Sequence, residues 1–327
     1  MRVLLIGTLL LLGALVALGV VVSWNRAPAE PEDPDRVTID LPEGHFYGGA
    51  SWGRLLDISP DGKRVVYIGR VPGKSARLYM HEIGTFKPRE IAGTHDAHDP
   101  TFSPDGRFVA FYAGESLKKG DIAENTLSVI GPVPDVRGIA WLGDDTFILG
   151  NVNGGLLRLD ASQPDPVPLF DFMGPQLAHL HPEILPGRKA VLFTIATGSV
   201  VYARIWMADL KTGEERPLLE ENAFAPRYVP TGHIVFARRI RRELAAVQFD
   251  LEKMKVAGSP QSVLQRPLSG RGSGGSTDFS ISGTGTLVYT PRRDDSIDDV
   301  LAELADVSLT QIHVQLNWLE ELKGLVQ

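Results

Sequence analysis

Two short histidine-rich segments are the places in this 327-residue sequence where metal chemistry would first be sought. Residues 95–99 read His-Asp-Ala-His-Asp, and residues 179–183 read His-Leu-His-Pro-Glu. Imidazole and carboxylate groups are common zinc ligands, but neither segment has the ligand spacing of a conventional zinc site. We therefore interpret both as polar segments that precede strands, and we predict neither a metal nor any other cofactor.

Residues 49–53 match Gly-x-Ser-x-Gly, the pattern around the nucleophilic serine of α/β-hydrolases. That pattern needs a strand before it and a helix after it. Here residues 54–58 are mostly apolar and lead directly into a tight turn, which predicts a strand instead. No other nucleophile or phosphate-loop motif is present in the sequence. We predict that the protein is not an enzyme.

Composition excludes several further classes of protein. Cysteine is absent, which rules out a disulfide scaffold, a cysteine nucleophile and a cysteine-linked lipid. The formal net charge is −7, which disfavours nucleic-acid binding even though residues 238–242 include four arginines. With 43% hydrophobic and 22% charged residues, most of the chain is expected to fold around a core.

The N-terminal segment predicts a membrane helix. Residues 3–22 contain no charge, and a helix of that length spans the hydrocarbon layer. Arg2 precedes the segment and an acidic, proline-rich stretch at residues 27–36 follows it, which favours export of the remaining chain. We predict a membrane anchor over residues 1–26, a linker over 27–36, and a location in the periplasm or outside the cell. The alternative is a signal sequence whose cleavage releases a secreted protein.

A repeat with a period near 44 residues dominates the rest of the chain. Ser-Pro-Asp-Gly occurs at residues 59–62 and 103–106, each time between two apolar runs, which predicts strand, tight turn and strand. Weaker copies end at Asp145, Gly187, Gly232 and Gly285. Further short apolar runs between the copies bring each period to about four strands, the signature of a propeller blade.

We therefore predict an all-β fold, a six-bladed β-propeller over residues 37–291, with an N-terminal transmembrane helix and a short C-terminal tail over 292–327. The alternative is a β-sandwich with coincidental turns. In the tail, residues 296–307 and a segment that begins at Asn317 have helical patterns, and residues 312–316 have that of a strand. Either this strand or residues 37–41 is expected to complete the last blade and close the ring.

The two Ser-Pro-Asp-Gly copies resemble the WD40-like repeat of TolB-type propellers. Residues 37–44 and 313–323 are similar to the segments that flank the exported propeller of bacterial membrane serine/threonine protein kinases. This resemblance implies a sensor-like role. The sequence departs from that family because it contains neither a glycine-rich loop nor a His-Arg-Asp motif, and no kinase domain precedes the membrane segment.

The repeat alignment predicts where a ligand binds, because equivalent positions of the inner strands form a ring around the propeller axis. One ring consists of Asp57, Thr101, Ala140, Glu183, Arg227 and Ser280. From this ring and its neighbours we predict a ligand-binding mouth made of Asp99, Arg137, His181, Glu183, Arg227 and Asp278. Its mixed charges favour a protein or peptide partner. The alternative interpretation is that these groups only solvate the mouth.

The function predicted from the sequence is a membrane-anchored, extracytoplasmic propeller that binds a protein or peptide partner without catalysis. One alternative is the sensor half of a kinase system. Another is an enzyme, a lyase or hydrolase, that uses His181, Glu183 and Arg227.

Overall fold

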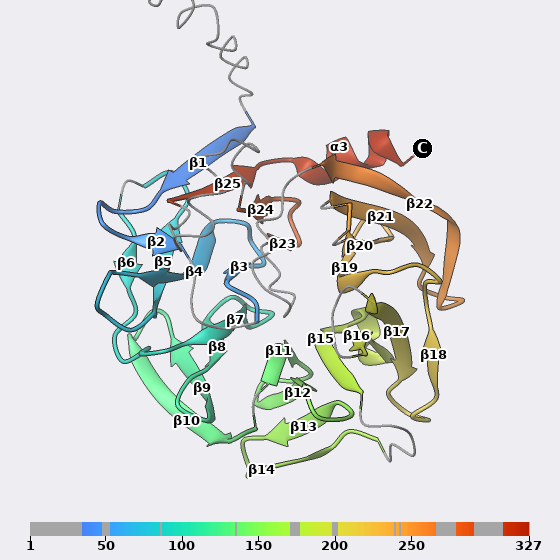
Figure 1. Ribbon diagram of the computed structural model, residues 1–327, viewed down its shortest axis with the longest axis horizontal. Coiled ribbons are helices and arrows are strands. Elements are labelled where there is room, and N and C mark those ends of the chain that lie inside the picture. Colours follow the sequence, from blue (N-terminus) through green and yellow to red (C-terminus); the bar gives the residue numbers. More distant parts are fainter. Residues whose placement is uncertain are drawn as a thin grey trace, which may run out of the picture. The chain divides into compact units, whose positions relative to one another are not determined.

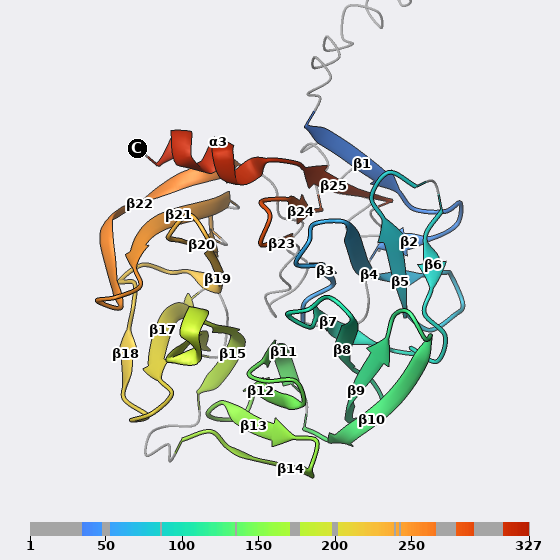
Figure 2. The ribbon, with the colours of Figure 1, turned by 180° about the vertical axis from the view of Figure 1, so that it is seen from behind.

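Sheets of short antiparallel strands are arranged radially about a common centre (Figures 1 and 2). The structure is a computed structural model. It describes residues 35–47, 53–85, 87–134, 136–170, 177–197, 202–238, 240–241, 243–265, 279–290 and 310–326. The predicted all-β fold is confirmed. The predicted membrane helix at residues 3–22 and the helix at 296–307 lie outside the described residues.

The first three repeats each contribute four strands, ordered from the centre outward. Repeat 1 consists of β3 (Leu56–Ile58), β4 (Arg64–Arg70), β5 (Arg77–Glu82) and β6 (Arg89–Glu90), and the short β2 (Phe46–Tyr47) also pairs with β4. Repeat 2 consists of β7 (His98–Phe102), β8 (Phe108–Tyr112), β9 (Ser116–Asp121) and β10 (Thr126–Pro132). Repeat 3 consists of β11 (Val136–Trp141), β12 (Thr146–Asn151), β13 (Leu157–Asp160) and β14 (Gln163–Pro168).

The next two repeats follow the same plan. Repeat 4 consists of β15 (Ala178–Ile184), β16 (Ala190–Ala196), β17 (Arg204–Asp209) and β18 (Glu215–Pro217), with the 3₁₀ turn η1 (Pro186–Arg188) between its first two strands. Repeat 5 consists of β19 (Phe224–Val229), β20 (His233–Arg238), β21 (Glu243–Asp250) and β22 (Lys255–Gln265). Repeats 3 and 4 form one eight-stranded sheet, in which Asn151 of β12 pairs with His179 of β15.

Repeat 6 is assembled from both ends of the described chain. Its strands run in the order β23 (Phe279–Ile281), β24 (Leu287–Tyr289), β25 (Gln311–Gln315) and β1 (Arg36–Asp40). The Leu41 N–H donates to the Thr310 carbonyl over 2.8 Å, which ties the first strand to the last. Both segments that the sequence offered for closure are therefore used, one beside the other (Figure 1).

The turn between the first two strands of a repeat has the geometry that its residues predict. The Gly62 N–H donates to the Ser59 carbonyl and the Gly106 N–H to the Ser103 carbonyl, each over 2.8 Å. Both glycines have positive φ, 73° and 71°. Glycine adopts this conformation without steric strain because it has no Cβ. The hydroxyl of Ser59 also accepts from the Arg64 N–H over 2.9 Å, so the serine stabilises both sides of the turn.

These turns also bring neighbouring repeats together. A Cβ added to Gly62 would lie 2.6 Å from the Thr284 hydroxyl, and one added to Gly106 would lie 3.4 Å from the Pro60 ring. The turns of repeats 6, 1 and 2 therefore contact one another in that order. The glycines serve two purposes, since they permit the positive φ and leave room for the next turn.

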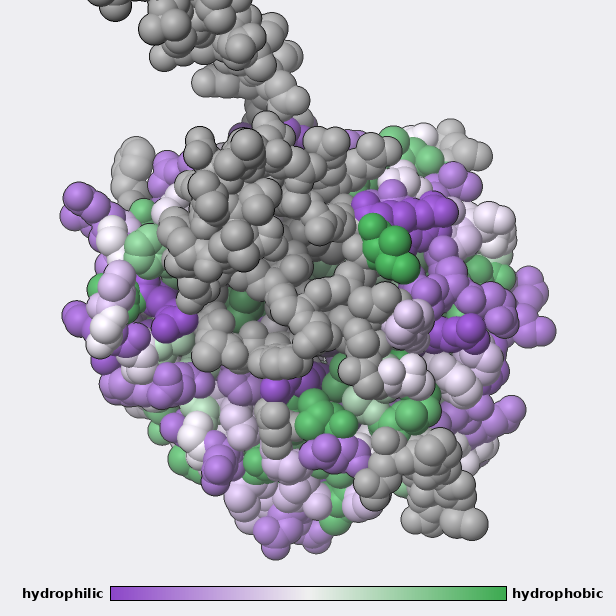
Figure 3. Space-filling view, viewed as in Figure 1, coloured by the Kyte–Doolittle hydropathy of each residue, from purple (hydrophilic) through white to green (hydrophobic). Residues whose placement is uncertain are grey.

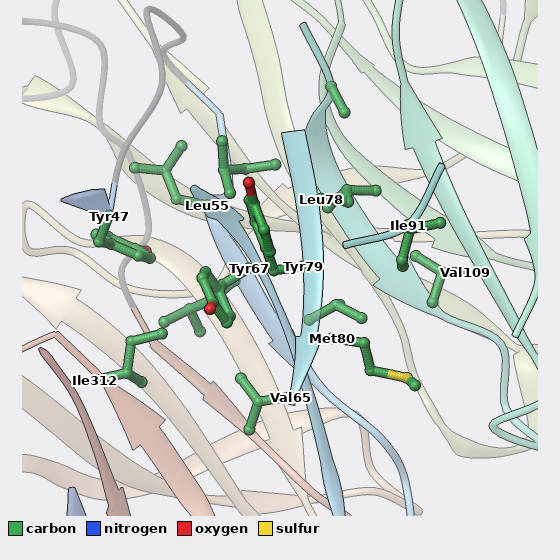
Figure 4. Close-up of a cluster of buried hydrophobic side chains, with 14 of the residues drawn as sticks. Tyr47, Leu55, Val65, Tyr67, Leu78, Tyr79, Met80, Ile91, Val109 and Ile312 are labelled. Atoms are coloured by element: carbon green, nitrogen blue, oxygen red, sulfur yellow. The ribbon is translucent and has the colours of Figure 1, made fainter. Parts of the chain in front are cut away.

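The hydrophobic core lies between adjacent sheets. Figure 4 shows the cluster around Tyr67 and Tyr79, whose rings are stacked with centroids 5.7 Å apart. The same cluster includes Val109 from repeat 2 and Ile312 from repeat 6. Because the apolar faces of neighbouring sheets cover each other, each repeat depends on its neighbours for burial of its core.

The C-terminal helix α3 (Trp318–Leu325) confirms the helix predicted to begin at Asn317. Its residues Trp318, Leu319 and Leu322 are buried in the core that repeats 4, 5 and 6 share. Among the described residues no helix is both long enough and apolar enough to cross a membrane.

Candidate functional site

Four of the inner strands contain a β-bulge at the same place. The pairing register shifts between His98 and Thr101, Val136 and Ile139, Leu180 and Glu183, and Phe224 and Arg227. Within each bulge one residue has a left-handed backbone: Asp99 (φ 53°), Gly138 (φ 95°), His181 (φ 52°) and Ala225 (φ 55°). Such a conformation strains a residue other than glycine, and it turns the side chain away from its regular direction in the strand.

Asp99 uses its bulge to bond the preceding repeat. It is 1% exposed, and its Oδ1 accepts from the Arg54 N–H over 2.9 Å while its Oδ2 lies 2.8 Å from Nδ1 of His98. The Asp99 N–H in turn donates to the Arg54 carbonyl over 3.0 Å. Gly53 makes room for this side chain, because a Cβ there would lie 1.8 Å from Oδ2 of Asp99.

Asp57 joins three repeats through one carboxylate. Its Oδ2 accepts from the Phe102 N–H of repeat 2 over 2.8 Å, and its Oδ1 accepts from the Ser280 hydroxyl of repeat 6 over 2.6 Å. Nη1 of Arg54 lies 3.4 Å from the same Oδ1. Arg54 and Asp57 are 5% and 6% exposed, so this ion pair is almost completely buried.

Glu183 makes the corresponding link between repeats 4 and 5. Its Oε1 accepts from the Tyr228 N–H over 3.3 Å, and its Oε2 accepts from Nη1 of Arg227 over 3.0 Å. In both cases an acidic residue on an inner strand bonds the N–H 45 residues further along the chain. The Glu183 side chain is 23% exposed, so the links reach solvent here.

Burial and neighbouring charges shift the pKa values of Asp57 and Glu183. Burial raises the pKa of Asp57, although the Arg54 charge, the Ser280 hydroxyl and the Phe102 N–H oppose the rise. Burial likewise raises the pKa of Glu183 to about 7, against the charge of Arg54 and the Tyr228 N–H, and the charge of Asp57 adds to it. Arg54 therefore lies within electrostatic range of both acids.

Asp99 shows the opposite balance. Burial acts to raise its pKa, but the His98 hydrogen bond and charge, the Arg54 N–H and the Arg137 charge together outweigh burial and hold the pKa below its usual range. We call the set linked by these bonds and charges the central cluster. It consists of Arg54, Asp57, Asp99, Arg137, Glu183 and Arg227.

The structure brings four of the six sequence-predicted site residues into this cluster: Asp99, Arg137, Glu183 and Arg227. His181 is 1% exposed and lies with its ring 6.2 Å from that of Phe224, packed between repeats. Asp278 lies outside the described residues, as do residues 49–52 of the Gly-x-Ser-x-Gly pattern. In the described part of the chain no group of three or more histidine, aspartate and glutamate side chains is placed to hold a metal ion.

Sequence reasoning missed Arg54 and the bulges. Arg54 is absent from the predicted mouth because it precedes the first strand of its repeat, outside the aligned positions. The bulges had a signal in the sequence, since Pro100, Pro182 and Pro226 directly follow three of the four left-handed residues. Proline cannot donate to a strand partner and occurs on edge strands or at bulges, so these prolines indicated irregular pairing in the inner strands.

The face of the molecule in Figure 3 is mixed in character. Hydrophilic side chains predominate around the rim, and apolar residues occur in small groups between them. Surfaces of this kind are normal for a protein in water, so the coloured part of this face does not single out a large apolar docking surface.

Comparisons with known proteins identify the fold. No protein-family model matches the sequence, and no curated protein matches it. Among solved structures, TolB from Acinetobacter baumannii superimposes with a TM-score of 0.56 at 17% identity over 78% of this chain. A chain of a mitotic checkpoint complex gives a TM-score of 0.54 at 12% identity, covering 89% of this chain and 97% of that one. Oligogalacturonate lyase from Vibrio parahaemolyticus gives 0.50 at 13%, covering 80% and 79%.

The radial sheets, the inner-strand ring and these superpositions define a β-propeller. Its fold is similar to that of TolB, the propeller whose WD40-like repeat the Ser-Pro-Asp-Gly copies resemble. The chain spans 64% of the length of the TolB chain that it matches.

The contact between Gly53 and Asp99 yields a stability prediction. In Gly53→Ala the new methyl group must displace the Asp99 carboxylate from two buried hydrogen bonds, so we expect a loss of about 2–4 kcal/mol in the free energy of unfolding. In an Asp99→Ala background the same change should cost much less, because the clashing group is gone. Denaturant unfolding of the four proteins of this cycle measures the coupling.

Gly143→Ala, whose Cβ would make only ordinary contacts at 3.8 Å, is the control. Equal costs of Gly53→Ala in both backgrounds would contradict this account.

Glu183 predicts a pH dependence. Its pKa of about 7 in the folded state lies above its unfolded value, so the folded protein binds the proton more tightly and stability falls as pH rises towards 7. Between pH 5.5 and 7.5 the wild type should lose about 2 kcal/mol relative to Glu183→Gln. Because burial lowers the pKa values of His81 and His233 in both proteins, their opposite effect cancels in the difference. A difference that stays constant across this range would show that Glu183 titrates normally.

Proposed function

We propose that the chain is a membrane-anchored, extracytoplasmic β-propeller of six blades that binds a protein or peptide partner at its central cluster and catalyses no reaction. The six blades are the six repeats, of which the last combines both ends of the described chain. The anchor is the uncharged segment at residues 3–22, which lies outside the described residues.

One observation carries the binding proposal: charged side chains from five repeats lie within electrostatic range of one another, and bonds between repeats hold most of them. Arg54 and Asp57 come from repeat 1, Asp99 from repeat 2 and Arg137 from repeat 3, while Glu183 and Arg227 come from repeats 4 and 5. No segment contributes a motif of its own, so a ligand there is recognised by the assembled ring. Positions fixed in this way are preorganised, which lowers the entropy cost of binding.

The bonding of the acids argues against catalysis. Both oxygens of Asp57 and both oxygens of Glu183 accept hydrogen bonds that hold neighbouring repeats together. A general base needs a lone pair directed at its substrate, and every oxygen of these two acids already directs at least one lone pair at the protein. Participation of a similarly folded chain in a mitotic checkpoint complex supports the use of this fold for protein contacts.

An enzyme remains the second candidate, because a carboxyl group with a pKa of about 7 is suited to general acid–base chemistry. The fold of oligogalacturonate lyase is consistent with it. The third candidate is the sensor half of a serine/threonine kinase system, which rests on the resemblance of residues 37–44 and 313–323 alone. We favour partner binding over the enzyme and the kinase sensor because the oxygens of Asp57 and Glu183 bond neighbouring repeats.

The topology can be tested on intact cells. If residues 3–22 anchor the chain with the propeller outside, protease added to spheroplasts should digest a C-terminal epitope tag while a cytoplasmic marker survives. The chain should also sediment with membranes after a carbonate wash. A tag that is protected in sealed spheroplasts and digested only after lysis would contradict export.

Partner binding is tested by crosslinking in the native membrane. A partner captured by the wild type should be lost or reduced at least tenfold with Arg137→Ala, which removes one charge from the central cluster at a half-buried position. Arg158→Ala, which removes an exposed arginine from an outer strand, should capture it normally. Loss with Arg158→Ala and retention with Arg137→Ala would move the binding surface to the outer faces.

A further inference from the structure

Arg54 is a buried arginine with few bonds. Its side chain is 5% exposed, and within the described residues its guanidinium donates one hydrogen bond, to Oδ1 of Asp57 over 3.4 Å. A guanidinium carries five N–H donors in a rigid plane. No Arg54 nitrogen is among the described side-chain atoms that are fully buried without a hydrogen-bond partner, so the nitrogens that make no bond to protein retain contact with solvent.

Arg238 shows how this chain satisfies a buried arginine. It is 6% exposed, and it donates three bonds to two carboxylates: Nε and Nη2 to Oε1 of Glu221 over 3.1 and 2.7 Å, and Nη1 to Oε1 of Glu243 over 2.9 Å. The two arginines are similarly buried as whole residues, but the protein supplies Arg238 with three hydrogen bonds and Arg54 with one. Arg54 lacks a planar acceptor of the kind that Arg238 has.

Asp57 does not fill that role. Its Oδ2 is taken by the Phe102 N–H at 2.8 Å, and its Oδ1 is shared with the Ser280 hydroxyl, which at 2.6 Å is much closer than Arg54 at 3.4 Å. The nearest acids are therefore committed to joining repeats. Glu183, which is within electrostatic range of Arg54, is bonded to Arg227 and Tyr228.

The balance of charge points to an anion. The central cluster contains three guanidinium groups and three carboxyl groups, and burial raises the pKa values of two of the acids, Asp57 and Glu183. Near neutral pH Arg54 remains charged while Glu183, whose pKa is about 7, is partly protonated, which lessens the negative charge within electrostatic range of Arg54. A monoanion on the ligand would supply negative charge at that place. A phosphate dianion fits less well, because Asp57 and Glu183 flank the arginine.

We propose that Arg54 is the recognition residue of a carboxylate subsite in the central cluster, where its guanidinium fork binds the two oxygens of a carboxylate on the ligand. Planar bidentate pairing of this kind is the strongest contact that an arginine makes with an anion. The inference rests on the proposed binding function, which it extends by naming the group that is recognised. In a peptide partner the carboxylate belongs either to the C-terminus or to an acidic side chain.

The test uses the full-length chain in detergent and three small probes at pH 7.5 and constant ionic strength. N-acetylglycine mimics a C-terminus, N-acetylglutamic acid α-amide offers only a side-chain carboxylate, and N-acetylglycinamide is the neutral twin of the first. Titration calorimetry should show binding of at least one carboxylate and none of the amide. The stronger of the two carboxylates identifies the source. Equal binding of the amide, stronger binding of inorganic phosphate, or no binding of any probe would overturn the proposal.

Variants separate recognition from structure. Arg54→Lys keeps the charge and loses the fork, so carboxylate affinity should fall about tenfold, and Arg54→Gln should abolish it. Arg158→Gln, at an exposed site, should bind normally. Because Arg54 has few partners, Arg54→Gln should lower the unfolding midpoint far less than Arg238→Gln, which breaks three bonds. If the two variants lower the midpoint equally, Arg54 is a structural group and the proposal is wrong.

The outcomes distinguish this inference from the proposed function. If a partner is captured in a manner that depends on Arg137 but tolerates Arg54→Lys, the binding function stands and the carboxylate subsite fails. If the small carboxylates bind through Arg54 but no partner depends on Arg137, the subsite stands and the protein-binding function fails.

Discussion

The hydrogen bonds of the Asp57 carboxylate connect three repeats, and the arrangement of the inner strands depends on them. The carboxylate accepts bonds from Phe102 in the next repeat and from Ser280 in the last. These partners are 45 and 223 residues away from Asp57 in the sequence. The inner strand of a radial sheet has one edge without a strand partner, and its polar groups must be satisfied by neighbouring repeats. Glu183 solves the same problem between repeats 4 and 5.

Satisfying the inner strands shapes the chemistry of the centre. Acidic side chains serve best there, because a carboxylate bonds a backbone N–H more strongly than a neutral acceptor does. Once the acids are committed to the backbone, Arg54 beside them donates a single side-chain bond, to Asp57. A structural requirement thus leaves positive charge with unused donors at the centre of the ring, which is what recognition of an anionic group requires.

The bulges position bonds between repeats, and they require strained backbone conformations. Asp99, His181 and Ala225 adopt left-handed conformations that strain residues with a Cβ. At Asp99 two hydrogen bonds to repeat 1 and a paired histidine compensate for that strain, and Gly53 leaves the space that the side chain needs. At Ala225 the backbone N–H donates to the Thr194 hydroxyl of repeat 4 over 3.0 Å. In both cases the bulge provides a bond between neighbouring repeats.

The sequence by itself determined the local units of this protein. Ser-Pro-Asp-Gly encodes its turn within four residues, and the alternation of turns and apolar runs predicted the strands, their number per repeat and the β-propeller. It also placed Asp99, Arg137, Glu183 and Arg227 near one centre, because equivalent residues of a ring must meet. Only the tertiary structure decided that β1 and β25 both enter the last sheet, since either segment had a strand pattern and pairing between chain ends is not encoded locally. It likewise decided that Glu183 and Arg227 bond each other and that Arg54 is short of acceptors, because hydrogen-bond satisfaction depends on groups from repeats 45 or more residues apart.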